Sequence, residues 1–138
     1  NLPGSALDLT YTIVCPLNLA DFVGNYTMDD GSPSDLCTII ISLDPGNPDG
    51  LIINNFYYGT GVGTISPVKI KVNRATYGIS LNPDPQVFAT YLWNPAWKNG
   101  TLSNLSGTLD ACTKNFSFKA DLSATVSFGP INYVCTRE

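Results

Sequence analysis

Residues 36–58 have the sequence LCTIIISLDPGNPDGLIINNFYY, in which two apolar segments flank a turn. The segments 36–43 and 51–58 are rich in β-branched and aromatic residues. Between them lie the Pro, Gly, Asn and Asp residues that turns favour. The stretch therefore predicts two β-strands. Because a parallel crossover needs a dozen or more residues, we expect these strands to be antiparallel neighbours.

The same pattern recurs along the whole chain, which predicts an all-β fold. The expected strands are 9–15, 22–28, 36–43, 51–58, 65–72, 76–81, 86–93, 101–109, 116–122 and 125–135. Residues 16–21 can form one short helical turn. Short connections predict an antiparallel meander of about nine or ten strands, which closes as a lipocalin-like barrel or folds over as a β-sandwich.

Length and composition indicate one domain, residues 1–138, with an extracellular character. Charged residues make up only 13% of the chain, and the net charge is −4. No run of Lys or Arg could follow a phosphate backbone, so nucleic acid is not an expected partner. No apolar run approaches the roughly 20 residues of a transmembrane helix, so we expect no transmembrane segment.

Four cysteines at wide spacing, in a chain without histidine, predict two disulfides rather than a metal site. Disulfides in turn indicate an oxidising compartment. Three connectivities are possible. In a closed meander the first and last strands are neighbours, which favours Cys15–Cys135 and leaves Cys37–Cys112. Four buried free thiols are the alternative.

Two motifs resemble a known group of proteins. Residues 14–27, VCPLNLADFVGNYT, and residues 105–118, LSGTLDACTKNFSF, together with the closing Thr136-Arg137, resemble a β domain of secreted and surface lipoproteins of Bacteroidota. The resemblance implies an antiparallel β fold, a secreted or cell-surface location, and outer-membrane proteins as neighbours. It also implies that residues 1–14 are a linker or a strand from a preceding domain, and that residues 15–138 are the domain proper. A lipoprotein's acylated cysteine would be its first residue, and here that residue is Asn1.

Aromatic residues predict a ligand-binding surface. Trp97 lies in a polar loop after Asn94, and Tyr57 and Tyr58 could join it. Tryptophan combines a large apolar area with a hydrogen-bond donor, so Trp97 could stack on a sugar ring or anchor a protein partner. Simple packing of the loop is the alternative.

Aspartates in turns suggest a cation site. If turns alternate between the two ends of the meander, Asp29, Asp30 and Asp35 share one end with Asp84, Asp110 and the 59–63 loop, while Trp97 lies at the other end. Carboxylates and backbone carbonyls are ligands that calcium prefers, so a structural calcium ion is conceivable there. Solvated turns are the favoured interpretation, and no other cofactor is expected.

Catalysis is not expected, because a chain without histidine has no Ser-His or Cys-His pair. A glycosidase built on Asp29 and Asp84 would need a fixed separation that nothing in the sequence supplies. We predict a non-catalytic extracellular module that binds glycan or protein within a larger surface complex. The alternative is a scaffold or filament subunit, with Ala6–Cys15 as a strand donated to a neighbouring chain.

Overall fold

The computed structural model describes residues 15–138, which form nine β-strands and two short 3-10 helices. In chain order these are η1 (Leu19–Phe22), β1 (Gly24–Asp29), η2 (Pro33–Asp35), β2 (Cys37–Leu43), β3 (Gly50–Asn54), β4 (Val68–Asn73), β5 (Gly78–Leu81), β6 (Gln86–Leu92), β7 (Asn94–Leu109), β8 (Phe116–Ser123) and β9 (Ser127–Arg137). The strand expected over 9–15, the donor segment 6–15 and the linker 1–14 lie outside the described residues, except for Cys15.

Alternating side chains explain why these segments form strands with one face buried. In β4 the side chains of Val68, Ile70 and Val72 are buried, whereas Lys69 and Lys71 are exposed. Because successive side chains in a strand point to opposite faces, this sequence places one apolar face on the core. The lysines then cover the outer face of the sheet.

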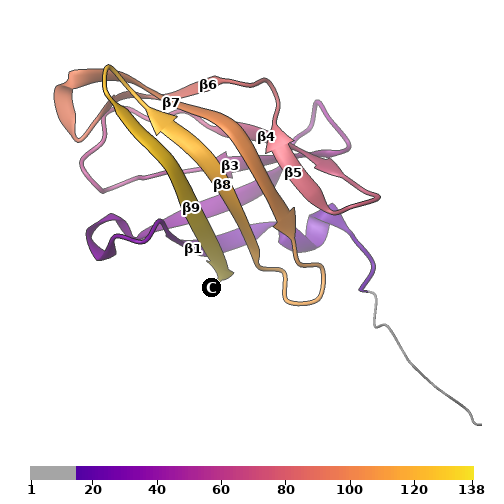
Figure 1. Cartoon of the computed structure of the whole chain (residues 1–138). Coiled ribbons are helices and arrows are strands. Elements are labelled where there is room, and N and C mark those ends of the chain that lie inside the picture. The colour runs from indigo at the N-terminus through magenta and orange to yellow at the C-terminus, as the bar shows by residue number, and fades with distance from the viewer. Residues whose placement is uncertain (1–14) are drawn as a thin grey trace, which may run out of the picture.

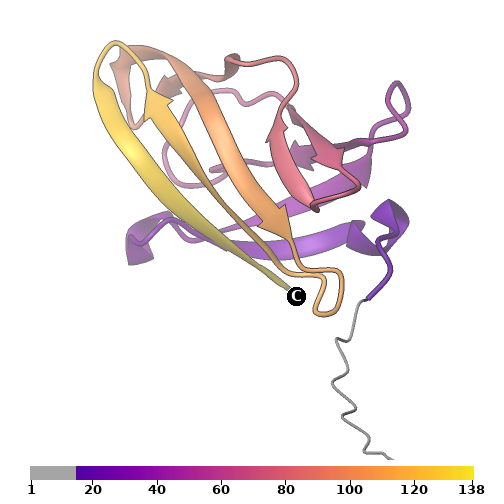
Figure 2. The same ribbon diagram turned by 45° about the vertical axis from the view of Figure 1, so that its right-hand side comes forward.

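The strands close into an antiparallel barrel, which confirms the all-β prediction (Figures 1 and 2). The sheet order is β5-β4-β3-β2-β1-β9-β8-β7-β6, and an additional pairing of β5 with β7 closes it. The first and last strands of the barrel, β1 and β9, are neighbours, with Met28 opposite Cys135.

One position in the barrel is shared by two strands, so nine strands close an eight-stranded barrel. β6 pairs with the first part of β7, from Asn94 to Leu102, and β5 pairs with Gly107 and Thr108 further along the same strand. The segment 82–85 between them, Asn-Pro-Asp-Pro, is therefore a break within one line of strand. It is not a hairpin turn.

Side chains replace the backbone pairing at this break, where Pro83 and Pro85 have no N–H to donate. The Asp84 carboxylate accepts a hydrogen bond from the backbone N–H of Asn104, 3.2 Å away, at an irregularity in β7. On the other side, the Gln86 amide exchanges two hydrogen bonds with the backbone of Lys69. Asp84 thus belongs to the wall of the barrel.

The barrel interior is filled by aromatic and aliphatic side chains. The ring of Phe56 lies 4.8 Å from that of Tyr57, 5.0 Å from Phe88 and 5.3 Å from Tyr133, measured between centroids. Small eight-stranded barrels are commonly filled in this way, at the packing density of a protein core. A binding site is therefore to be sought on the surface or at an end of this barrel.

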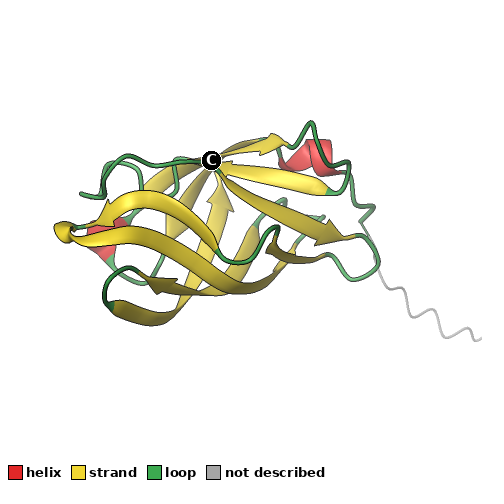
Figure 3. Cartoon of the chain, turned by 90° about the horizontal axis from the view of Figure 1, so that it is seen from above, coloured by secondary structure: helices red, strands yellow, loops and turns green. Residues whose placement is uncertain are grey.

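The barrel has two ends, which we name for their contents. The aromatic end comprises the connections 30–36, 55–67 and 124–126 together with Trp93 between β6 and β7. The disulfide end comprises residues 15–23, 44–49, 74–77 and 110–115. The two 3-10 helices lie at opposite ends, η1 beside the disulfide and η2 at the aromatic end (Figure 3).

One disulfide is formed, between Cys15 and Cys112, with the Cα atoms 5.2 Å apart. The predicted pairs Cys15–Cys135 and Cys37–Cys112 are both wrong. Cys15 precedes η1 and lies beside the 110–115 turn, whereas the side chain of Cys135 points from β9 into the core and is completely buried. Cys37 and Cys135 are free thiols. Burial raises the pKa of both.

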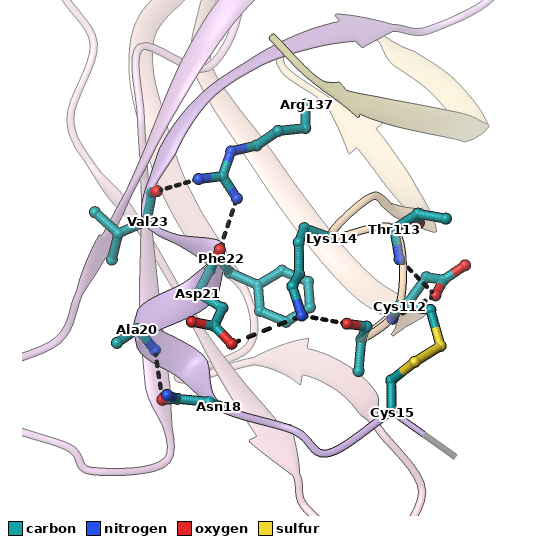
Figure 4. Close-up of polar contacts among 12 residues, drawn as sticks. Cys15, Asn18, Ala20, Asp21, Phe22, Val23, Cys112, Thr113, Lys114 and Arg137 are labelled. Carbon is teal, nitrogen blue, oxygen red and sulfur yellow. Dashed lines mark hydrogen bonds and ion pairs between the residues drawn. A yellow bond between two sulfur atoms is a disulfide. The ribbon is translucent and has the colours of Figure 1, made fainter. Parts of the chain in front are cut away.

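Polar contacts cross-link the disulfide end around η1 (Figure 4). The Lys114 ammonium lies 3.6 Å from the Asp21 carboxylate, and the Asn18 side chain accepts a hydrogen bond from the backbone N–H of Ala20. The Arg137 guanidinium donates to the carbonyl oxygens of Asp21, at 2.6 Å, and Val23, at 2.9 Å. This end therefore holds the start of the domain against its last strand.

Candidate functional site at the aromatic end

All the residues predicted to bind a ligand or a cation lie at or near the aromatic end. These residues are Asp29, Asp30, Asp35, Tyr57, Tyr58, Asn94 and Trp97. The expectation that Trp97 lies at the opposite end from these aspartates is wrong. The prediction counted 82–85 as a reversal of the chain, but β5 and β6 run in the same direction. Every turn after residue 85 therefore lies at the opposite end of the barrel from the one predicted, and Asp110 lies at the disulfide end.

A row of aromatic rings runs inward from Trp97. The centroid of Trp97 lies 5.6 Å from Phe128, Phe128 lies 5.3 Å from Trp93, and Trp93 lies 5.2 Å from Tyr57. All three contacts are edge-to-face, the arrangement that the charge distribution of aromatic rings favours. Trp97 is therefore held at the outer end of the row by a ring that is itself packed on the core.

The two tryptophans of the row differ in their polar atoms. The Trp93 indole N–H donates to the Thr60 hydroxyl at 3.2 Å, which ties the 55–67 loop to the turn between β6 and β7. The Trp97 indole N–H has no hydrogen-bond partner among residues 15–138, yet no buried side-chain nitrogen there is left without one. Trp97 is half-buried, and its N–H is consequently accessible to solvent, where it can donate to a ligand.

Tyr57 and Tyr58 are neighbours in sequence with opposite surroundings. Tyr58 is 65% exposed, whereas Tyr57 is completely buried. The Tyr57 hydroxyl donates to the Asp30 carboxylate at 2.7 Å and is hydrogen-bonded to the Tyr133 hydroxyl at 3.0 Å. Tyr57 therefore holds Asp30 and cannot itself contact a ligand. The exposed Tyr58 side chain can contact one.

Burial keeps this hydroxyl chain neutral. It raises the pKa of Tyr57 and of Tyr133 far above the ordinary value for tyrosine, and for Tyr57 the neighbouring Tyr133 adds to the effect. Neither phenol can serve as a base near neutral pH. The chain of hydroxyls instead fixes the 30–36 loop to the barrel interior.

The three aspartates do not converge on a cation site. Asp29 accepts a hydrogen bond from the N–H of Gly31, and Asp30 accepts one from the N–H of Ser32, so each carboxylate folds back on its own turn. Within residues 15–138, no group of three or more His, Cys, Asp or Glu side chains is placed to hold a metal ion. The calcium hypothesis thus gains no geometric support.

Asp35 lies at the end of η2, close to Asp30. Partial burial raises its pKa, and the nearby charge of Asp30 raises it further. The pair makes this mouth of the barrel locally negative. Asp84, which the sequence offered as a partner for Asp29, lies in the wall at the strand break instead.

Sequence reasoning missed two parts of this site. Phe128, which supports Trp97, lies in the expected strand 125–135, but nothing in the sequence linked it to Trp97. The Asp30–Tyr57–Tyr133 network joins residues that are 27 and 76 positions apart. An early signal was available for one member only, because Tyr57 closes a segment of alternating apolar residues.

Shallow depressions of the outer surface lie elsewhere, around Thr108. One is lined by Cys15, Tyr77 and Asp110, and the next by Asn115, Ser117 and Val134. They contain no cluster of aromatic rings and no paired charges. We therefore place the candidate site at the aromatic end.

No protein-family model matches the chain, and neither a curated protein nor a solved structure matches it. Among residues 15–138, no helix is long and apolar enough to span a membrane. The resemblance to surface lipoproteins of Bacteroidota consequently stays a prediction.

Proposed function

We propose that this domain is a non-catalytic binding module of the cell exterior and that it binds a glycan at the aromatic end. The observation that carries the proposal is the position of Trp97. Phe128 fixes the ring, and the indole N–H faces solvent. A fixed aromatic surface with a free donor suits a sugar, which presents an apolar ring face edged by hydroxyl groups.

Neighbouring groups at this end suit the hydroxyl groups of a sugar. Asn94 begins β7 in an exposed position and accepts a hydrogen bond from the N–H of Ala96, which leaves its amide NH₂ to donate. Tyr58 adds an exposed phenol. A glycan needs such a mixture of a stacking surface and polar groups of both kinds.

Within residues 15–138, the walls of the barrel offer no apolar centre to a protein partner. Ile40 and Leu43 lie on β2, Val87 on β6 and Val134 on β9, and these strands are not neighbours in the sheet. A stable protein interface needs about 800 Å² from each partner around an apolar centre. At the aromatic end itself Leu36, Tyr58 and Val126 are exposed, so a protein partner at this end is the alternative to a glycan.

Strand pairing with another chain gains no support from the barrel. Within residues 15–138, β1 pairs with β9 and β5 pairs with β7, so the sheet is closed. The other side of β6 is covered by residues 63–66. A scaffold of surface or outer-membrane subunits would therefore depend on residues 1–14. Assembly lost on deletion of these residues would revive that alternative.

An extracellular location is supported by the Cys15–Cys112 disulfide, because such bonds persist in oxidising compartments. A non-catalytic role is supported by the lack of histidine and by the buried, neutral state of Tyr57 and Tyr133.

A glycan array tests the proposal, with the full chain and the variant Trp97→Ala. We expect the variant to lose at least about tenfold in affinity for any glycan that binds, the effect of losing an anchoring residue. Val134→Ala, which truncates an exposed apolar side chain of β9, is the matched control and should bind normally.

A second variant guards against a folding defect, since Trp97→Ala uncovers Phe128. Asn94→Ala removes an exposed amide and should weaken the same glycan by a few-fold with only a small change in the melting temperature, because the hydrogen bond it loses is exposed to water. If no glycan binds, or if Trp97→Ala and Asn94→Ala both bind a glycan as tightly as the unaltered chain does, the aromatic end is not the binding site. Hydrolysis of a polysaccharide that Asp30→Asn or Asp35→Asn abolishes would contradict the non-catalytic role.

A further inference from the structure

Every sulfur atom of the chain outside the disulfide belongs to one row of side chains. The chain has four cysteines and a single methionine, Met28. Met28 on β1 is paired in register with Cys37 on β2 on one side, and with Cys135 on β9 on the other. Three adjacent strands therefore present a thiol, a thioether and a thiol side by side.

All three side chains point into the barrel. Met28 and Cys135 are completely buried, and Cys37 is partly buried against the same core. The concave inner face of a barrel turns the side chains of neighbouring strands toward each other. The register therefore places the three sulfur-bearing side chains on one patch of the inner face, where the Cys37 sulfur also accepts a hydrogen bond from the backbone N–H of Tyr57.

The two thiols face an oxidising environment without forming a bond. Neighbouring strands lie about 4.8 Å apart, so the Cα atoms of Cys37 and Cys135, two strands apart, are separated by about 9–10 Å. A disulfide needs Cα atoms within about 7 Å. The intervening strand β1 therefore keeps these cysteines as thiols, although Cys15 and Cys112 in the same chain are oxidised.

We propose that Cys37, Met28 and Cys135 form a binding site for a soft monovalent metal ion, Cu(I). Thiolate and thioether sulfurs are the ligands that select Cu(I) among the metals of proteins. A structural zinc site takes four cysteine or histidine ligands, and an iron–sulfur cluster takes four cysteines, so two cysteines with one methionine suit neither. Copper stays Cu(I) throughout, and each of the two thiols releases its proton to solvent on binding.

The surroundings give the ion a way in. Cys37 lies at the start of β2 and is only partly buried, directly after η2 and the 30–36 loop. Asp30 and Asp35 in that loop give the mouth a negative charge, which raises the local concentration of cations. Tyr57 and Tyr133 lie at the same mouth, between the acidic loop and the core.

Copper titration of the full chain tests the site, under anaerobic conditions with ascorbate, which leaves the Cys15–Cys112 disulfide intact. We expect one Cu(I) per chain in competition with the chelator bicinchoninate. Cys37→Ser with Cys135→Ser should lower the affinity by at least about a hundredfold, and Met28→Leu, which keeps the side-chain volume, by about tenfold. Ile39→Val, in the next inward position of β2, is the matched control and should bind as the unaltered chain does.

Three results would overturn the proposal. The first is no stoichiometric uptake, or uptake that survives loss of both thiols. The second is unchanged affinity in Met28→Leu. The third is a Cys37–Cys135 disulfide, found by alkylation and mass spectrometry of the untreated chain. If the cysteine variants fail to fold, X-ray absorption of the copper-loaded unaltered chain decides, because three sulfur neighbours are expected and nitrogen or oxygen neighbours would contradict the site.

Discussion

The two ends of this barrel contain the same kinds of residue but use them differently. Each has aspartates in turns and tyrosines that donate hydrogen bonds. At the disulfide end, the Asp110 carboxylate accepts from the backbone N–H groups of Cys112 and Thr113, and these bonds lower its pKa. At the aromatic end, burial and the charge of Asp30 raise the pKa of Asp35. At the disulfide end hydrogen bonds stabilise the charged carboxylate, whereas at the aromatic end two carboxyl groups lie close together.

This difference separates structural from functional roles. The disulfide end is cross-linked by Cys15–Cys112 and by the hydrogen bonds of Arg137, so its polar groups are occupied. At the aromatic end the Trp97 N–H faces solvent and two like charges lie close together. Stability is commonly given up where a protein binds its ligand. The contrast predicts that the largest single loss of stability comes from removing the disulfide, and that neutralising Asp35 at the aromatic end gives a gain.

Removal of the disulfide should have the largest effect. Cys15→Ser with Cys112→Ser opens a loop between residues 97 positions apart, and loop entropy predicts a loss of about 4.7 kcal/mol in the free energy of unfolding. Guanidinium unfolding without reductant measures it. Reductant should bring the unaltered chain to the same stability and leave the variant unchanged. A further loss in the reduced variant would reveal a second disulfide and contradict the free state of Cys37 and Cys135.

Loss of the buried hydroxyl at the aromatic end should come next. Tyr57→Phe leaves the Tyr133 hydroxyl buried without this partner and removes a donor from Asp30, which should cost about 1–3 kcal/mol. Tyr58→Phe is the matched control, and because Tyr58 is 65% exposed, its effect should stay within about 0.5 kcal/mol. Urea unfolding compares the two. Equal effects would mean that the hydroxyl chain does not hold the 30–36 loop.

A tyrosine at the other end calibrates this loss. The Tyr77 hydroxyl donates to the carbonyl oxygen of Cys15 at 3.1 Å in a partly buried position. Water can replace that partner, so Tyr77→Phe should cost about 0.5–1.5 kcal/mol. A larger loss from Tyr77→Phe than from Tyr57→Phe would contradict the expectation that the fully buried hydroxyl contributes more than the partly buried one.

Much of the fold followed from local pattern, because alternation and turn residues act within a few positions. The strand expected over 65–72 is present as β4, and its alternating sequence agrees with the burial of Val68, Ile70 and Val72. Local pattern failed at the start of β7, where Asn94, Pro95 and Asn99 suggested a loop and the structure has strand from Asn94 onward. Pairing with β6 in a hairpin decides that segment, because cross-strand packing overrides the low strand propensity of Asn and Pro.

The candidate site was predicted as a set of residues but not as an arrangement. The end on which Trp97 lies depended on whether residues 82–85 reverse the chain. The disulfide pairing failed for another reason, because Cys135 points into the core and Cys15 lies beside the 110–115 turn. Pro83 and Pro85 indicate a turn in either case, so sequence could not distinguish a hairpin from a break within one strand. The Asp84–Asn104 contact that stabilises the break joins residues of different strands.

The opposite pKa shifts of Asp35 and Asp110 give the smallest effects and the sharpest comparison. The pKa of Asp35 is raised in the folded state, so its charged form destabilises the fold as pH rises through that pKa. Asp35→Asn should therefore stabilise at pH 7, by about 0.5 kcal/mol or less, and should gain nothing near pH 3.

The pKa of Asp110 is lowered, so its contribution is present at neutral pH and is lost as pH falls through the folded pKa. Asp110→Asn should cost stability at pH 7 and nothing at low pH. Denaturant unfolding of both variants across this range measures the difference from the unaltered chain. If both variants change the free energy of unfolding in the same direction at pH 7, the two ends do not differ in how they stabilise a charged carboxylate.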